Sequence, residues 1–339
     1  MTLTRLPLAL LGAALGVAAP LAAPPAAAPA APVLTAVADV PLPGPAVRFD
    51  YQTLDIGSDR LYIAHMGAGE ILVFNVRTRK VDATIAGMPG VTGVWAVPEL
   101  HRVYASVTRL HQVAVIDDQT LQVVARVGNI GFPDGIAFAP DQRKVYVSDE
   151  SGGGELVIDA ATNATSTLQL DGGEAGNSVF DAGSRCILVN VQTKNAVYVI
   201  DPRNDRILGR FALQGAARPH GMAIDAARRL AFIANEKDGR VLMVDLRRMR
   251  VLDSEQAGNA PDVLAYDPGW QRLYVASESG VVSVFTATTS ALVPEGDVTM
   301  PHAHSVAVDP RTHLVYFPLQ DIGGRPVLRV MSGTPPRDD

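Results

Sequence analysis

Short runs of alternating apolar residues recur along the chain at a nearly constant spacing. In runs such as Lys144–Ser148 and Arg272–Ala276, branched or aromatic residues alternate with small ones, which is typical of β-strands rather than helices. Seven such runs are separated by 42, 42, 42, 44, 42 and 42 residues, and their central positions are Tyr62, Tyr104, Tyr146, Leu188, Phe232, Tyr274 and Tyr316. A fixed period of this length predicts a repeat architecture.

Each period holds three further strand patterns. A run ending in Asp or Asn follows thirteen residues after the tyrosine position in the first five copies, as in Val113–Asp117. A second strand pattern precedes the tyrosine run of each repeat, as in Ile136–Pro140. A third follows the run that ends in Asp or Asn, as in Leu121–Val127. Gly, Pro, Asp and Asn separate the runs, and no helical periodicity occurs. Four strands in 42 residues describe one propeller blade, so residues 33–332 are predicted to form a single, all-β, seven-bladed propeller with four-stranded antiparallel blades.

The two ends of this region complement each other. The last copy ends with Pro326–Met331 and lacks a fourth strand, whereas Val33–Val40 reads as a strand that comes before the first copy. We therefore expect this N-terminal strand to complete the last blade, because an open ring would expose unpaired edges. Residues 333–339 are predicted to be a disordered C-terminal tail.

The first thirty residues have the pattern of an export signal. Arg5 precedes the apolar run Leu6–Ala19, which is followed by the Ala/Pro-rich stretch Pro20–Pro32. This order of charged, apolar and small residues is typical of a secretory signal peptide, and the apolar run is shorter than the ~20 residues that span a bilayer. Residues 1–30 are therefore predicted to be a signal peptide and Ala/Pro-rich segment with an undecided cleavage site. The expected location is periplasmic or secreted, with no membrane span.

Composition narrows the function classes. The 339 residues are 47% hydrophobic, which excludes intrinsic disorder. Cys186 is the single cysteine, which excludes an intramolecular disulfide, a CxxC redox pair and a thiolate zinc cage. Lys and Arg number 29 against 35 Asp and Glu, so the charge balance argues against a nucleic-acid partner. The one basic cluster, predicted to be a solvated outer edge of blade five, comprises Arg228, Arg229, Arg240, Arg247, Arg248 and Arg250.

The tyrosine tetrads point to a family. Tyr146–Asp149, Phe232–Asn235, Tyr62–His65 and Tyr274–Ser277, with the Val-x-Val-Ile-Asp strand that follows in some copies, resemble the YVTN family of β-propeller repeats, especially the YncE-like exported proteins. The resemblance covers nearly the whole predicted propeller. The resemblance implies a propeller fold and export. Because DNA binding is known among YncE-like proteins, it also keeps nucleic-acid binding as a third hypothesis. The Gly-His and Trp-Asp pairs of WD repeats are missing.

The repeat also predicts where chemistry gathers. Twelve residues before each tyrosine position, in the expected turn into the innermost strand, stand Asp50, Thr92, Asp134, Gly176, His220, Asp262 and His304. Four residues after it, in a loop expected on the same face, stand Met66, Thr108, Glu150, Gln192, Glu236, Glu278 and Gln320. The predicted ligand-binding residues at this channel mouth are Asp50, Asp134, His220, Asp262, His304, Glu150, Glu236 and Glu278.

Two functions compete for this set. The first is an exported, non-catalytic, monomeric propeller that binds a protein or a small polar ligand at the mouth. The second is a metal-assisted enzyme, lactonase- or lyase-like, because His220, Asp262 and His304 could form a first shell for Zn²⁺, Cu²⁺ or Fe²⁺, with Glu236 as an acid or base. Pro133-Asp-Gly135 and Pro219-His-Gly221 could instead be turns in which Asp or His caps backbone amides. No catalytic residue is assigned, and a divalent metal is left open.

Overall fold

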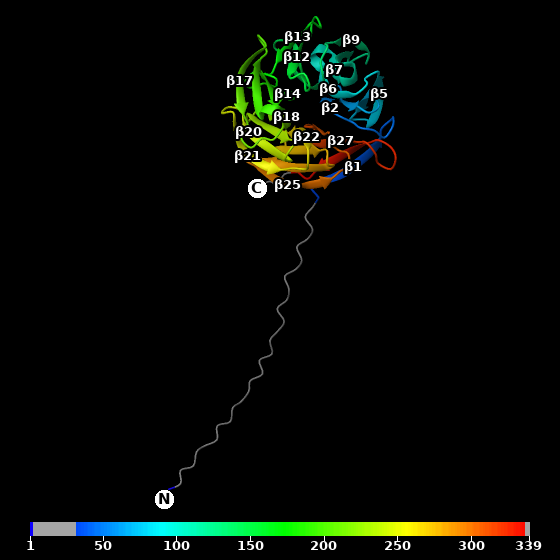
Figure 1. Cartoon of the computed structure of the whole chain (residues 1–339). Helices are drawn as coiled ribbons and strands as arrows, with labels where there is room; N and C mark the ends of the chain where they lie inside the picture. Colours follow the sequence, from blue (N-terminus) through cyan, green and yellow to red (C-terminus); the bar gives the residue numbers. More distant parts are fainter. Residues whose placement is uncertain (3–31, 336–339) are drawn as a thin grey trace. The chain divides into compact units, whose positions relative to one another are not determined.

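Seven four-stranded antiparallel sheets form a ring of blades in the computed structural model, which describes residues 1–2 and 32–335 (Figure 1). The first strands of neighbouring blades contact one another around the ring, so they are the innermost strands. The predicted all-β, seven-bladed propeller is confirmed.

The blades follow the chain, each from its innermost to its outermost strand. Blades one to three are β2 (Gln52–Asp55), β3 (Arg60–His65), β4 (Glu70–Asn75), β5 (Lys80–Ala86); β6 (Val91–Val97), β7 (Arg102–Val107), β8 (Gln112–Asp117), β9 (Val123–Val127); and β10 (Pro133–Ala139), β11 (Lys144–Asp149), β12 (Gly154–Asp159), β13 (Thr165–Gln169). Blades four and five are β14 (Ala175–Asp181), β15 (Cys186–Val191), β16 (Ala196–Asp201), β17 (Arg206–Ala212); and β18 (Pro219–Asp225), β19 (Leu230–Asn235), β20 (Arg240–Asp245), β21 (Arg250–Gln256). Blade six is β22 (Pro261–Asp267), β23 (Arg272–Ser277), β24 (Val281–Ala287) and β25 (Leu292–Thr299).

Blade seven joins the two ends of the propeller. It consists of β26 (Ala307–Asp309), β27 (Leu314–Leu319), β28 (Val327–Gly333) and, outermost, β1 (Leu34–Pro41). The strand β1 runs antiparallel to β28, from Leu34 opposite Gly333 to Pro41 opposite Val327. In Figure 1 this blue strand lies in the same blade as the red C-terminal strands. The predicted closure by the N-terminal strand is confirmed, and it leaves no blade incomplete.

The ends of the chain add little to this picture. Strand β28 runs to Gly333, the first residue of the predicted tail. The last residues of that tail, 336–339, lie outside the described residues. Residues 3–30 of the predicted signal segment also lie outside them. Helix among the described residues is confined to three single 3₁₀ turns, η1 (Pro98–Leu100), η2 (Thr108–Leu110) and η3 (Gln192–Lys194). No helix in the described part is long and apolar enough to cross a membrane.

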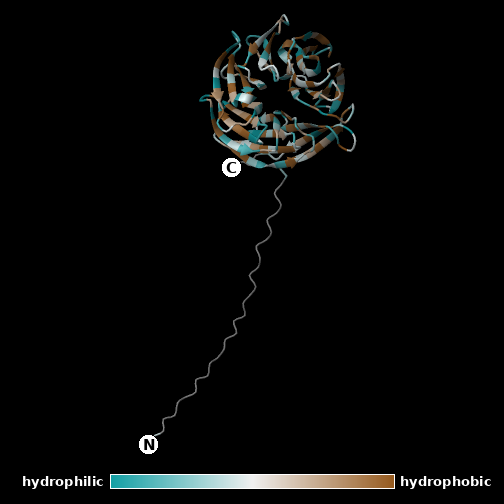
Figure 2. Cartoon of the chain, viewed as in Figure 1, coloured by the Kyte–Doolittle hydropathy of each residue, from teal (hydrophilic) through white to brown (hydrophobic). Residues whose placement is uncertain are grey.

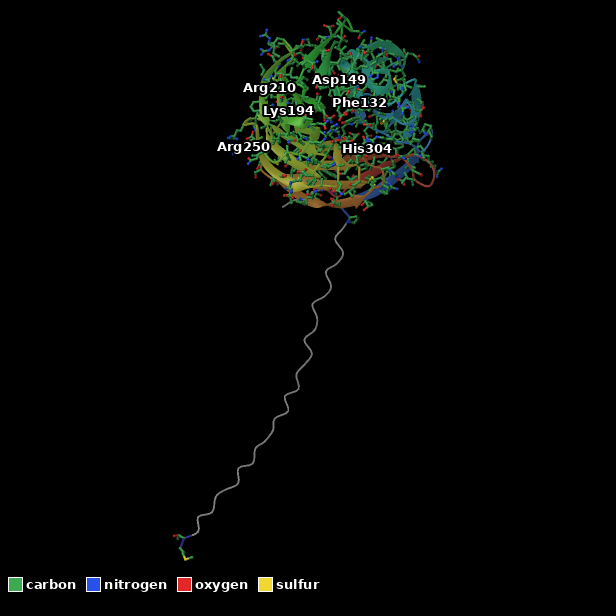
Figure 3. The ribbon with its side chains drawn as sticks, viewed as in Figure 1. Phe132, Asp149, Lys194, Arg210, Arg250 and His304 are labelled. Atoms are coloured by element: carbon green, nitrogen blue, oxygen red, sulfur yellow. The ribbon has the colours of Figure 1, made fainter. Side chains whose placement is uncertain are left out.

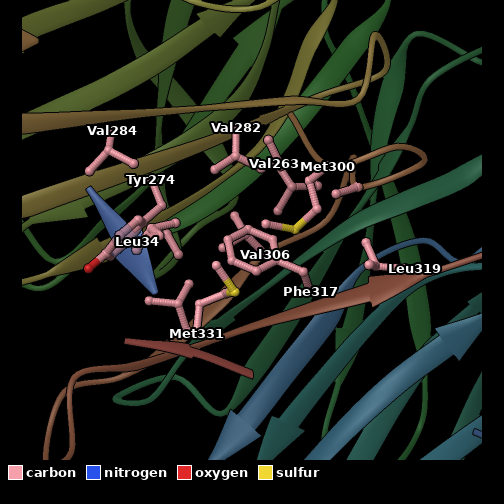
Figure 4. Packing of buried hydrophobic residues seen from close by; sticks show 14 residues of the cluster. Leu34, Val263, Tyr274, Val282, Val284, Met300, Val306, Phe317, Leu319 and Met331 are labelled. Carbon is pink, nitrogen blue, oxygen red and sulfur yellow. The ribbon is translucent and has the colours of Figure 1, made fainter. Parts of the chain in front are cut away.

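The hydrophobic core lies between adjacent blades. Inner strands pack on a neighbouring blade with both faces, so β3 and β7 are almost continuously buried. The outer strand β5 instead alternates exposed residues with residues that are mostly half-buried. Hydrophobic residues accordingly follow the strands in Figure 2. Figure 4 shows one such cluster between blades six and seven, where Leu34 of β1 packs with Tyr274 and Phe317. Strand β1 therefore contributes to the core as well as to the sheet.

The innermost strands begin with an irregularity that concerns the channel. In β10 the register shifts between Pro133 and Ile136, and β6, β14, β18 and β22 shift at the same position. Sequence reasoning placed the ring residues in the preceding turn, but Thr92, Asp134, Gly176, His220 and Asp262 are each the second residue of their strand. Asp50 and His304 precede β2 and β26. A bulge of this kind bends the strand and re-aims its side chains.

The glycine after some ring residues has a steric reason. A Cβ on Gly221 would lie 1.8 Å from the Asp262 carbonyl oxygen, and one on Gly93 would lie 2.0 Å from that of Asp134. At these two positions the neighbouring inner strand approaches so closely that no side chain fits. The glycines thus permit the tight ring that brings the charged side chains together.

Candidate functional site

An imidazole links two carboxylates at one mouth of the channel. His220 of blade five places Nδ1 3.0 Å from Asp262 Oδ1 of blade six and Nε2 3.6 Å from Asp134 Oδ2 of blade three. The shorter contact is an ion pair between the imidazolium and the Asp262 carboxylate. Asp50, from blade one, and His304, from blade seven, join them, and none of the five is more than 7% exposed. Figure 3 shows His304 near the centre of the ring.

The three buried carboxylates respond differently to this environment. Burial, reinforced by the charges of Asp134 and Asp262, raises the pKa of Asp50 well above its ordinary value. Burial also raises the pKa of Asp134, to about 6, although His220 opposes the rise. Burial acts in the same direction on Asp262, but there His220 and other cations hold the pKa below its ordinary value. At neutral pH the negative charge of the mouth is therefore carried by Asp262 and Asp134, the two carboxylates in contact with His220.

The two buried histidines are also unlike each other. Burial disfavours the charged form of His220, but contact with Asp262 and the charge of Asp134 raise its pKa to about 10. Burial lowers the pKa of His304, and the nearby Asp262 offsets this only in part. His304 Nε2 is buried and has no hydrogen-bond partner among the described residues. The mouth thus holds one imidazolium in a charge network and one neutral imidazole with a free ring nitrogen.

The three predicted glutamates lie on the rim of the same mouth. Glu150 Oε1 accepts a hydrogen bond of 3.0 Å from the Gln192 amide, and Glu236 lies 3.4 Å from the Arg218 guanidinium. Glu278 lies 2.7 Å from the Arg48 guanidinium and also beside the buried ring. The structure therefore brings Glu278 to the buried residues, whereas Glu150 and Glu236 pair with their neighbours on the rim.

One set of three side chains has the spacing of a metal site. Asp262, Glu278 and His304 can each offer one ligand atom such that these atoms lie within 4.8 Å of one another. The sequence suggested His220 in place of Glu278. The structure differs because His220 is already engaged between Asp262 and Asp134.

Sequence reasoning missed two residues that flank Asp50. Arg48 lies between Glu278, at 2.7 Å, and Asp50, at 3.7 Å. Tyr51 donates a hydrogen bond of 2.8 Å to Asn177 Oδ1 of blade four. A signal for Tyr51 was available, because the equivalent positions in the other repeats are all smaller: Gly93, Gly135, Asn177, Gly221, Val263 and Ser305.

Tyr51 and Asn177 separate the polar mouth from the rest of the channel. Both line a cavity of about 110 Å³ whose other walls are largely apolar and include Val94, Val179 and Met222. At the opposite mouth lies an apolar recess of about 520 Å³. The cluster of Asp50, Asp134, Asp262, His220 and His304 therefore lies at one mouth of the channel.

The arginine cluster of blade five is largely engaged with its own surroundings. Arg228 contacts Asp225 and the Tyr266 hydroxyl, Arg229 pairs with Asp181, and Arg248 pairs with Asp245 at 2.8 Å. Arg250 is exposed on the outermost strand β21, and Figure 3 shows it at the edge of the ring. These contacts favour the structural interpretation of the cluster over a nucleic-acid surface.

Comparisons with known proteins agree with the fold and extend over part of the sequence. No family model matches the chain. The chain is 26% identical over 154 residues to antigen Lp49 of Leptospira interrogans, which is 42% of this chain and 31% of Lp49. It is 25% identical over 171 residues to the uncharacterized protein YncE of Salmonella typhi, which is 48% of this chain and 46% of YncE. The chain thus spans less than half the length of these relatives. The predicted resemblance to YncE-like proteins is confirmed.

Solved structures are similar in fold alone. The WD40 repeats of RRP9 match with a TM-score of 0.75 at 13% identity, over 89% of this chain and 100% of that one. Virginiamycin B lyase from Staphylococcus aureus matches with a TM-score of 0.73 at 11% identity, over 88% of this chain and 98% of that one. Such identities carry no functional residue from one protein to another.

Proposed function

We propose that this protein is an exported, YncE-like β-propeller that binds a positively charged group, of a small polar ligand or of a protein side chain, at the mouth formed by Asp50, Asp134 and Asp262. Its role there is binding rather than catalysis.

The observation that carries this proposal is the surplus of buried carboxylates. Asp50, Asp134 and Asp262 are all buried, and His220 is the cation in closest contact with two of them. Burial of a charge is costly unless it is paired. A cationic group that enters the mouth would stabilise the ionised carboxylates, and the rigid ring already holds them in place, which lowers the cost of binding.

The state of His220 supports a binding role. An imidazole between two carboxylates is held as the cation and has no free base nitrogen to accept a proton near neutral pH, which a general base needs. The alternative, a metal-assisted enzyme, is favoured by the spacing of Asp262, Glu278 and His304.

A titration with small cations tests the proposal. We expect spermidine and agmatine to raise the melting temperature of the protein, whereas citrate and glucose leave it unchanged. Asp134→Asn should weaken the binding of the cations at least about tenfold, because a buried charge partner is lost. The isosteric change keeps the contact geometry, and circular dichroism verifies the fold.

The matched control is Asp238→Asn, which removes a carboxylate from the exposed β19–β20 loop. This variant should bind like the wild type. Equal binding by Asp134→Asn and wild type, or a response to citrate instead of the cations, would refute the proposed function.

Export is proposed from the pattern of Arg5 and Leu6–Ala19. The expected result is a mature protein, isolated from the periplasm or medium of its own host, whose first residue lies beyond Ala19. Mass spectrometry of the intact chain measures this directly. A chain that still begins at Met1 and stays in the cytosol would show the prediction to be wrong.

A further inference from the structure

We propose that Asp262, Glu278 and His304 bind a divalent transition-metal ion, such as Zn²⁺ or Mn²⁺, at the channel mouth. The inference rests on the proposed function, because it names one positive charge that the mouth would accept.

His304 provides the observation that points to a ligand. Its side chain is buried, and its Nε2 atom has no hydrogen-bond partner among the described residues. A buried polar atom without a partner costs free energy, so such atoms are rare in folded proteins. Asp262 and Glu278 place carboxylate oxygens within 4.8 Å of a ring nitrogen of this residue. A metal ion would supply the missing partner and neutralise both carboxylates.

The scaffold fixes two of the three donors. Asp262 is the second residue of β22, and His304 lies in the segment before β26, and both are buried. Glu278 follows β23, and its side chain is 40% exposed. Metal–ligand bonds of about 2.0–2.2 Å allow two donors to lie at most about 4.4 Å apart. Because its side chain is partly exposed, Glu278 is free to adjust to this spacing.

The donor set selects the class of metal. One imidazole with two carboxylates suits Zn²⁺, Mn²⁺ or Fe²⁺, whereas Ca²⁺ and Mg²⁺ prefer oxygen ligands throughout. The remaining coordination positions would face the channel, where a polar ligand could reach them.

Two cations already face these donors. The guanidinium of Arg48 lies 2.7 Å from Glu278 Oε1, and the His220 ring lies 3.0 Å from Asp262 Oδ1. The Arg48 side chain is 41% exposed, so it can turn into solvent when a metal takes Glu278. Arg48 therefore competes with the metal, and its removal should strengthen binding, an effect that a purely structural role would not produce.

Isothermal titration of the metal-stripped mature protein with ZnCl₂, MnCl₂ and CaCl₂ tests the inference. We expect one Zn²⁺ or Mn²⁺ ion per chain and weaker Ca²⁺ binding. Glu278→Gln and His304→Gln should each lower the affinity about tenfold or more. Arg48→Gln should raise it roughly twofold to fivefold, the effect of removing one exposed ion pair.

Asp238→Asn is again the control, because it removes a carboxylate from the exposed β19–β20 loop and leaves all three donors in place. It should bind metal like the wild type. The inference is overturned if the wild type binds no Zn²⁺ or Mn²⁺, if Glu278→Gln binds as tightly as wild type, or if His304→Gln changes nothing while Ca²⁺ binds best. Since Glu278 is exposed, its variant tests the site even if His304→Gln fails to fold.

The two proposals can fail separately. If the wild type binds no metal but binds spermidine in a manner that depends on Asp134, the metal inference fails and the proposed function stands. If the protein binds the metal but Asp134→Asn does not change its affinity for spermidine, the proposed function fails and the metal inference stands.

Discussion

A chain that lacks β1 is expected to melt more than about 10 °C below the intact propeller and to aggregate. Its loss would expose the edge of β28 from Val327 to Gly333, and an unpaired edge is a template for association. It would also remove Leu34 from the core cluster between blades six and seven. A buried leucine contributes about 2–5 kcal/mol and each strand hydrogen bond about 1 kcal/mol, and each kcal/mol shifts the melting temperature by about 2–4 °C.

The comparison uses a chain that begins at Leu42 and a control that begins at Pro32 and keeps β1. We expect the control to melt like the mature protein. A synthetic peptide of residues 33–41, added in trans, should restore part of the lost stability by strand addition, whereas a scrambled peptide should not. Equal melting temperatures of the two chains would contradict the role of β1 as the closing strand.

The second large effect is expected at Glu155, a carboxyl group buried between blades three and four. Its Oε1 atom accepts a hydrogen bond of 2.7 Å from the Ser178 hydroxyl, and its Oε2 atom is buried without a partner among the described residues. Burial raises the pKa of Glu155 to about 8. Near neutral pH this side chain is therefore neutral in the folded protein and charged in the unfolded chain.

The sign of the pH dependence follows from that difference. Below the unfolded pKa of 4.5 Glu155 is protonated in both states, so its ionisation does not affect the stability. Between pH 4.5 and the folded pKa of about 8 the folded state holds one more proton, so stability falls as the pH rises. Above this range the loss is complete, and it amounts to on the order of a few kcal/mol.

Glu155→Gln should remove this loss, because the amide keeps the shape and cannot ionise. Urea unfolding at pH 4.5, 6 and 8 should give similar free energies for variant and wild type at the lowest pH and a variant that is more stable by a few kcal/mol at the highest. Glu99→Gln, at an exposed site in η1, is the control and should follow the wild type throughout. A Gln variant less stable than wild type at pH 8 would show that the carboxylate is needed in the fold.

The sequence predicted the ring of blades and its closure because both depend on local patterns that repeat. Strand alternation and the 42-residue spacing are visible in the chain itself, and the missing fourth strand at one end matches the extra strand at the other. The face on which Asp50, Asp134 and Asp262 gather followed from the same alignment. The repeat also held an unused signal, since Glu155 occupies the position of Ile71, Val113, Val197 and Val241, all of which are buried.

The pairing within the mouth could not be predicted, because it depends on distances across the ring. Tyr51 bonds Asn177, which lies 126 residues away, and Arg48 bonds Glu278, which lies 230 residues away. The bulge in the innermost strands decides which side chains point at each other, and His220 is thereby committed to Asp134 and Asp262. Because His220 is committed in this way, the candidate metal ligands are Asp262, His304 and Glu278.

Native mass spectrometry of the mature protein from its own host tests most directly whether the mouth holds a positively charged ligand. We predict a bound species, a metal ion or an organic cation, that is lost when Asp134→Asn and Glu278→Gln are combined and kept in the Asp238→Asn control. A bound anion, or a bound species that persists in the double variant, would contradict the account.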